Sequence, residues 1–207
     1  MVKYNNYSNT SALAAKMKEI KSQFAVTHPG FNPPNINSVT IETDGVNHIN
    51  VGEQGMTELG QALSFKTALP FTHPEFGDFI CVEALVQYLI TGQKYEEYRT
   101  MLGGQAHTYT KKNKLATFDI GREFNRYVLE ATYAKVAAYK EIQDELLKCD
   151  LPFDKYHVTE VERDKEGHRQ YTITRPPSAG WFIPGVEEIR LALHENREPD
   201  FSYILIS

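Results

Sequence analysis

The chain has 207 residues, of which 22 are basic and 27 are acidic, and its formal net charge at pH 7 is −5. This length supports a core that needs neither disulfides nor structural metals. The acidic balance argues against sequence-specific binding of duplex DNA, because that binding depends on neutralising phosphates. We expect no membrane span and no signal peptide, since apolar runs of the necessary length are missing. Cys81 and Cys149 are the two cysteines, and we expect them to be free thiols in a reducing cytoplasm.

The first part of the chain predicts a helix, a loop and a hairpin in that order. Apolar side chains three or four residues apart predict an amphipathic helix over 11–24. Prolines and a glycine predict a loop over 27–34. Asp44 and Gly45, placed between β-branched residues, are typical of a β-hairpin turn.

The central part is predicted to be mainly helical. Residues 61–66 fit a short strand, and the segment 69–79, rich in proline, phenylalanine and glycine, fits a loop. An apolar run predicts a buried helix over 82–89, which is continued over 95–102. A pair of glycines follows directly and is expected to end this helix.

The longest predicted element is a helix over 121–149, in which apolar side chains form one stripe. Strands over 156–162 and 168–174 are predicted to pair as a second hairpin. A helix over 186–196 and a closing strand over 202–206 complete the pattern. Strands and helices do not alternate, so we expect an α+β fold with a helical core and short hairpins.

Common motifs for cofactors, metals and nucleophiles are missing from the sequence. It has no dinucleotide-binding or P-loop glycine motif, no His-Glu-x-x-His or Cys-x-x-Cys pair, and no Gly-x-Ser-x-Gly elbow. Its seven histidines are scattered along the chain. We therefore expect neither a metal nor a bound cofactor.

Glu83 stands out because it begins an otherwise apolar helix directly after an aromatic-rich segment. Acidic residues are common near a helix N-terminus, where the helix dipole stabilises them. A carboxylate in an aromatic-walled pocket can instead act as a base or stabilise a positive charge. The residues alone leave both interpretations open.

Two later residues also attract attention. Asp154 lies in a predicted loop beside two aromatic residues, a place that suits a turn or capping aspartate. Trp181, the single tryptophan, fits either a core anchor or a platform on which a base stacks.

Several of these segments resemble, in order, elements of the NADAR superfamily of YbiA-like proteins. Residues 63–66 and 80–87 are similar to the family's Ser-Asn-Phe element and its Pro-Thr-x-Glu-His-x-x-Gln helix. Residues 106–111 and 130–136 are similar to its Ala-x-x-x-Gly-Arg element and its Glu-Ala-x-x-Ala-Lys-Phe helix. The later segments, from residue 151 onward, resemble members encoded by bacteriophages.

The similarity extends over residues 61–195 and predicts an N-terminal extension over 1–60 and a NADAR-like domain over 61–207. The chain departs from the family pattern at several site positions. Ala84 stands where the family has a histidine, and Thr110 and Lys111 stand where it has Gly-Arg.

The resemblance implies hydrolysis of an N-glycosidic bond in an ADP-ribose-like nucleotide or an ADP-ribosylated guanine. For a phage member, this chemistry would act in the host cytoplasm against defences that use NAD-derived signals. Glu83 is the implied catalytic carboxylate, which stabilises an oxocarbenium-like transition state and directs water, and Asp154 is the implied second catalytic residue. The implied substrate-binding residues are Ser64, Lys66, Phe79, Gln87, Lys111, Tyr156 and Trp181.

Two other classes of function stay open. The altered site residues, Ala84 above all, fit a binding module that sequesters an NAD-derived nucleotide without cleaving it. The net charge of −5 and the unassigned residues 1–60 fit a protein that plugs a host enzyme. The sequence does not fix the oligomeric state, and a homo-oligomer is among the states it allows.

Overall fold

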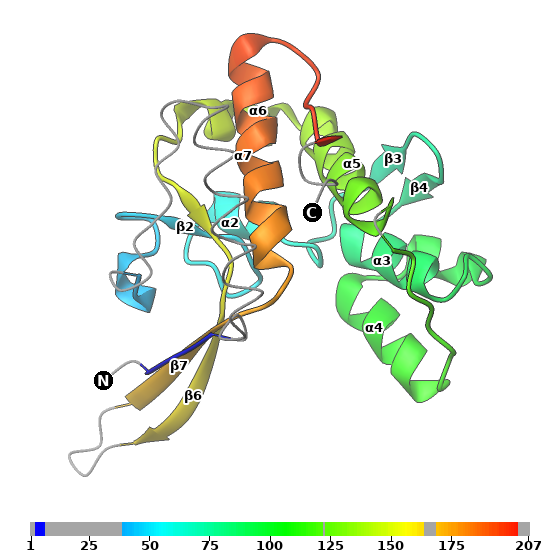
Figure 1. Ribbon diagram of the computed structural model, residues 1–207, viewed down its shortest axis with the longest axis horizontal. Helices are drawn as coiled ribbons and strands as arrows, with labels where there is room; N and C mark the ends of the chain where they lie inside the picture. Colours follow the sequence, from blue (N-terminus) through cyan, green and yellow to red (C-terminus); the bar gives the residue numbers. More distant parts are fainter. Residues whose placement is uncertain (1–2, 7–38, 122, 164–168, 203–207) are drawn as a thin grey trace. The chain divides into compact units, whose positions relative to one another are not determined.

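The computed structural model describes residues 3–6, 39–121, 123–163 and 169–202 (Figure 1). It is a mixed fold with about 49% helix and 13% strand, which confirms the expected α+β class. Within these ranges, no helix has both the length and the apolar character that crossing a membrane requires. The helix predicted over 11–24, the loop over 27–34 and, apart from Ser202, the strand over 202–206 lie outside the described residues.

The chain divides into two compact units. Unit 1 comprises the described residues up to Gln61 together with 150–187. Unit 2 comprises 62–149 together with the described residues from Glu188 onward. The predicted boundary after residue 60 lies next to the first of these divisions, but 150–187 join the N-terminal part rather than the predicted NADAR-like domain.

Unit 1 contains a three-stranded sheet of order β1-β7-β6, with bounds β1 Lys3–Asn6, β6 His157–Arg163 and β7 Arg169–Arg175. The antiparallel pair β6 and β7 forms the predicted second hairpin, drawn as a long ribbon in Figure 1. β1 pairs with β7 in parallel. Val39, Tyr156 and Ile173 form a buried cluster within this unit.

The hairpin predicted at Asp44 and Gly45 is wrong. A short 3-10 helix, η3 Ile41–Thr43, precedes the turn, and the following strand, β2 Ile49–Asn50, pairs in parallel with β5 Phe153–Asp154. The Asp44 carboxylate accepts the backbone amides of Asn50 and Met56, at 2.8 and 2.7 Å. Asp44 therefore stabilises a compact loop through these hydrogen bonds and does not form the turn of a hairpin.

The strand predicted over 61–66 is also wrong, because the chain forms the short helix α2 Glu58–Ala62 and then turns. Gly60 allows this helix to approach the backbone of Asn50 closely. A Cβ atom there would lie 2.4 Å from the carbonyl oxygen of Asn50.

Unit 2 is mainly helical, and its central helix α3 packs against both α4 and α5 (Figure 1). The predicted helix over 82–89 is confirmed as α3. The bounds are α3 Val82–Ile90, η4 Glu96–Thr100, α4 Gly103–Lys112, α5 Glu123–Ala138 and α6 Lys140–Lys148.

The segment 69–79, predicted as a loop, contains two antiparallel strands, β3 Phe71–His73 and β4 Gly77–Phe79. Phe71 and Phe79 are opposite each other in this pair and both are buried. Alternation over only three residues in each strand is too short to be recognised against the proline and glycine around it.

The glycine pair at 103 and 104 begins a helix, whereas the prediction ended one there. A Cβ atom on Gly103 would lie 2.6 Å from the Cα of Lys66, while one on Gly104 would meet nothing within 4 Å. Gly103 is thus a packing residue that lets the start of α4 approach the backbone at Lys66. The helix predicted over 95–102 is in fact the 3-10 helix η4.

The long helix predicted over 121–149 is interrupted at Tyr139, which has extended backbone angles of φ −127° and ψ 105°. Gln143 at the start of α6 donates its side-chain amide to the carbonyl oxygens of Val136 and Ala137, at 3.2 and 3.0 Å. The Tyr139 hydroxyl donates to the carbonyl of Pro70 at 3.1 Å. The two Gln143 bonds satisfy carbonyls in the last turn of α5, which a helix end leaves without partners.

The last helix, α7 Ala179–Glu195, begins seven residues before its predicted start at 186 and contains Pro184 in its interior. A proline removes one backbone donor from a helix. Phe182 and Ile183 are buried, and their burial offsets this cost. The predicted free thiols are confirmed: Cys81 is buried and Cys149 is half-buried.

Candidate functional site

The nine residues predicted for the site fall into two groups. Six of them, Ser64, Lys66, Phe79, Glu83, Gln87 and Lys111, belong to unit 2. Asp154, Tyr156 and Trp181 belong to unit 1. Each group is described within its own unit.

Glu83 lies in the first turn of α3 and is held from two sides. Its backbone amide donates to the carbonyl of Phe65 at 2.8 Å, which fixes the start of the helix. Gln87 is one turn further on and donates its side-chain amide to Oε1 of Glu83 at 2.8 Å. Glu83 and Gln87 therefore share one face of α3. The Glu83 side chain is 13% exposed.

A buried chain of hydrogen bonds sets the orientation of Gln87. The hydroxyl of Thr110 donates to Oε1 of Gln87 at 2.7 Å, and it is bonded to the hydroxyl of Tyr98 at 2.6 Å. Because Oε1 accepts from Thr110, the amide nitrogen of Gln87 must face Glu83. Thr110 and Tyr98 thus hold the side-chain amide of Gln87 in the orientation in which it donates to the Glu83 carboxylate.

One titratable side chain of α4 lies close to this carboxylate, and two lysines lie near that side chain. Nδ1 of His107 lies 4.0 Å from Oε1 of Glu83. Lys111 is one turn beyond His107 on α4, and Lys66 lies where Gly103 meets the backbone. Burial lowers the pKa of His107, and the charges of Lys111 and Lys66 lower it further.

Ser64 and Lys135 support the turn that carries Lys66. The buried ammonium of Lys135 on α5 donates to the carbonyl oxygen of Ser64 at 2.9 Å. The Ser64 hydroxyl accepts the backbone amide of Lys66 at 3.4 Å. Ser64 is 3% exposed, so its geometry suits a role in holding the turn.

Phe79 packs within unit 2 instead of lining an open surface. Its ring is 2% exposed and lies 6.3 Å from the ring of Phe71 and 5.5 Å from that of Tyr88. The guanidinium of Arg99 lies over the Phe79 ring, 4.7 Å from its centre. This environment favours a core and cation–π role over stacking on a base.

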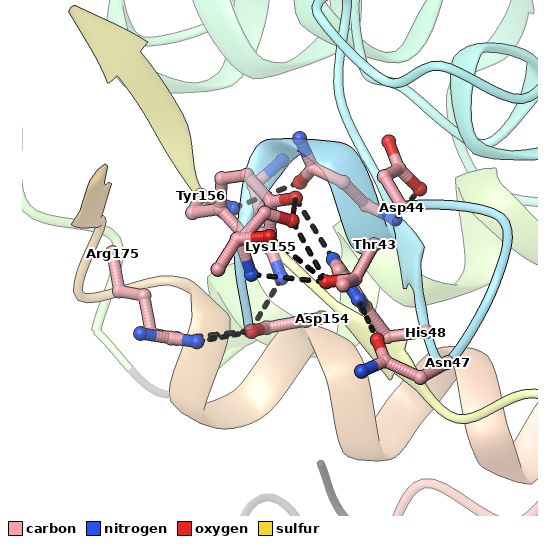
Figure 2. Close-up of polar contacts among 10 residues, drawn as sticks. Thr43, Asp44, Asn47, His48, Asp154, Lys155, Tyr156 and Arg175 are labelled. Atoms are coloured by element: carbon pink, nitrogen blue, oxygen red, sulfur yellow. Dashed lines mark hydrogen bonds and ion pairs between the residues drawn. The ribbon is translucent and has the colours of Figure 1, made fainter. Parts of the chain in front are cut away.

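Asp154 in unit 1 is enclosed by donors, as Figure 2 shows. Nε of Arg175 lies 3.1 Å from both carboxylate oxygens, and the backbone amide of Lys155 donates to Oδ1 at 2.8 Å. The side chains of Asp154 and Arg175 are 10% and 4% exposed. A buried carboxylate held by a buried guanidinium and a backbone amide suits a structural role.

Tyr156 is part of the same buried region (Figure 2). Its hydroxyl is hydrogen-bonded to Nε2 of His48 at 2.8 Å, and Nδ1 of His48 is bonded to the side-chain oxygen of Asn47 at 2.7 Å. Tyr156 is 2% exposed, and burial lowers the pKa of His48. Trp181 is half-buried in the first turn of α7, where its ring meets Phe182 edge to face at 5.8 Å.

Sequence reasoning missed His107, Thr110 as a hydrogen-bonding residue, Tyr98 and Lys135. A signal existed for Lys135, because it falls on the apolar stripe of its helix between buried residues. His107 carried no such signal, since its position depends on how α4 packs against α3. In the described part of the chain, no group of three or more His, Cys, Asp or Glu residues could hold a metal ion.

The unit 2 arrangement can bind an anion and carry out acid–base chemistry next to it. It combines a held carboxylate, an exposed imidazole next to it and two ammonium groups near that imidazole. We name this set, Lys66, Glu83, Gln87, His107 and Lys111, the Glu83 site. No family model, curated protein or solved structure matches the chain.

Proposed function

We propose that the Glu83 site hydrolyses the N-glycosidic bond of an ADP-ribose-like nucleotide or of an ADP-ribosylated base. The observation that carries the proposal is the carboxylate of Glu83, held by Gln87 and placed 4.0 Å from His107. The pattern resemblance described above supports it at Glu83 and Gln87. Asp154, Tyr156 and Trp181 stay predictions for this function.

The chemistry of the bond fits these residues. Cleavage of an N-glycoside builds positive charge on the anomeric carbon, and a fixed carboxylate stabilises that charge. Glu83 also accepts hydrogen bonds and can therefore orient the attacking water. Lys66 and Lys111 supply positive charge for a phosphate or diphosphate on the same ligand. Gln87 keeps the carboxylate in position through its side-chain amide.

Mass spectrometry tests the proposal directly. Wild type and Glu83→Gln are incubated with ADP-ribose conjugates, cyclic ADP-ribose isomers and ADP-ribosylated guanosine. Both the solution and the denatured protein fraction are analysed. We expect wild type to release a free base from one of these compounds, and Glu83→Gln to lose about 10²–10⁴-fold in rate while it keeps its fold. Glu97→Gln is the matched control, because Glu97 is an exposed residue of η4 in the same unit.

A nucleotide-binding module without turnover is the second candidate function. Ala84 favours it, because this residue is fully buried and supplies no proton donor where the family has a histidine. In this case one compound disappears from solution and returns intact from the denatured fraction. Wild-type rates in Glu83→Gln would instead remove Glu83 from the mechanism altogether.

A further inference from the structure

His107 is a neighbour of Glu83 to which the sequence assigned no role. Its Nδ1 on α4 lies 4.0 Å from Oε1 of Glu83 on α3. The His107 side chain is 48% exposed, compared with 13% for Glu83. The imidazole is therefore more accessible to a ligand than the carboxylate is.

Three charged groups lie near this imidazole. Lys111 lies one turn further along α4, Lys66 lies in the turn that follows α2, and Glu83 lies on α3. Burial lowers the pKa of His107, as do the two lysines. In the free protein these effects favour the neutral imidazole.

We propose that His107 is the general acid of the reaction at the Glu83 site, and that a substrate phosphate bound by Lys66 and Lys111 charges it. This inference rests on the proposed function. A phosphate that pairs with the two lysines cancels the positive charge facing His107, and the Glu83 carboxylate then favours the imidazolium form. Binding of the correct ligand thus takes up part of a proton per site from solvent.

The proton has a defined path through the reaction. The bond between the anomeric carbon and the base nitrogen breaks, its electron pair stays on the nitrogen, and His107 donates its proton there. A water molecule forms the new bond to the anomeric carbon and gives its proton to Glu83. The products are the free base and a ribose hydroxyl, and the proton on Glu83 then exchanges with solvent and restores the starting state.

An NMR titration tests the charging step without any turnover. The protein is labelled at histidine, and the His107 signal is assigned by its loss in His107→Gln. We expect saturating inorganic pyrophosphate to raise the titration midpoint of His107 by about one pH unit. The rise should shrink in Lys66→Gln and in Lys111→Gln, and it should persist in Lys112→Gln, which removes the exposed neighbour of Lys111. An unchanged midpoint in wild type, or an equal rise in all variants, would overturn the charging step.

Kinetics of His107→Gln on ADP-ribosylated guanosine test the catalytic step. We expect kcat to fall about 10²–10⁴-fold. The remaining activity should no longer decline above the midpoint that NMR gives for liganded His107. A kcat equal to that of wild type overturns the role of His107 and leaves the proposed function intact. If wild type releases no base, the proposed function fails, and the pyrophosphate titration alone decides whether phosphate charges His107.

Discussion

The Asp154 region of unit 1 and the Glu83 site of unit 2 each place a carboxylate beside a basic side chain, but the two arrangements suit different roles. Their carboxylates are almost equally buried, with side chains 10% and 13% exposed. Their neighbours differ, because Arg175 beside Asp154 is 4% exposed and His107 beside Glu83 is 48% exposed. The burial of the partner therefore separates a structural ion pair from a site that a ligand can reach.

The largest effect is expected from breaking the buried pair in unit 1. Arg175→Met leaves the Asp154 carboxylate buried without its cation, and we expect the free energy of unfolding to fall by about 3–5 kcal/mol. Glu83→Gln should change it by less than about 1 kcal/mol, because it keeps the shape and the partly exposed surroundings of the side chain. Urea denaturation of both variants makes the comparison. Equal losses in the two variants would abolish the distinction between the two regions.

The next largest effect concerns the glycines that begin α4. Gly103→Ala places a methyl group 2.6 Å from the backbone of Lys66. We expect a loss of about 1–3 kcal/mol from overpacking, together with weaker phosphate binding as Lys66 is displaced. Gly104→Ala is the matched control: its methyl group meets nothing within 4 Å. That variant should be neutral or more stable by up to about 1 kcal/mol.

A smaller effect is expected from the hydrogen-bond chain behind Gln87. Thr110→Val keeps the shape of the side chain but removes the donor to Gln87 and the partner of Tyr98. We expect unfolding to become easier by about 1–3 kcal/mol and kcat to fall, because Gln87 is then free to rotate away from Glu83. Thr108→Val on the exposed side of the same helix is the control for both measurements. Unchanged kcat in Thr110→Val would show that the orientation of Gln87 does not matter.

The smallest effect is a dependence of stability on pH that both units share. Burial lowers the pKa of His48 in unit 1 and of His73 in unit 2 below the ordinary value of 6.5. The unfolded chain therefore binds more protons as the pH falls below 6.5, and folding loses stability there. Between pH 7.5 and 5.5 each histidine should contribute at most about 1.4 kcal/mol to this loss. His48→Gln and His73→Gln should each flatten the profile measured by urea denaturation, and a profile equally steep in both variants would rule out this origin.

The spacing of apolar residues predicted those helices and strands whose pattern is long enough to be recognised within one element. The apolar run that became α3 and the two strands that became β6 and β7 are examples, since their periodicity is long enough to be read. The same holds for Glu83 and Gln87, because a spacing of four residues on a helix fixes a shared face. The hydrogen bond between the two side chains follows from that spacing.

The remainder of the Glu83 site depends on contacts between elements that are distant in the sequence. From the sequence alone Gly103 resembles a helix terminator. The close approach of Lys66 shows that it is a packing residue instead. The same packing of α4 brings His107 to Glu83, which no local spacing encodes. In unit 1, Asp44 looks like a hairpin turn residue, but the backbone amides of Asn50 in β2 and of Met56 donate to its carboxylate instead. Propensity at that turn is outweighed by these hydrogen bonds.

Cys81, at the start of α3, is a built-in probe of how often this part of the chain opens to solvent. Its thiol is fully buried two residues before Glu83, and burial raises its pKa, so little thiolate forms in the folded protein. Cys149 is half-buried and should be alkylated first. The later, slower alkylation of Cys81 then reports how often the start of α3 opens to solvent. If a diphosphate ligand holds Lys66 and α4 against the start of α3, Cys81 will be alkylated more slowly when the ligand is bound. The half-life of the Cys81 thiol then measures the fraction of the protein that carries the ligand.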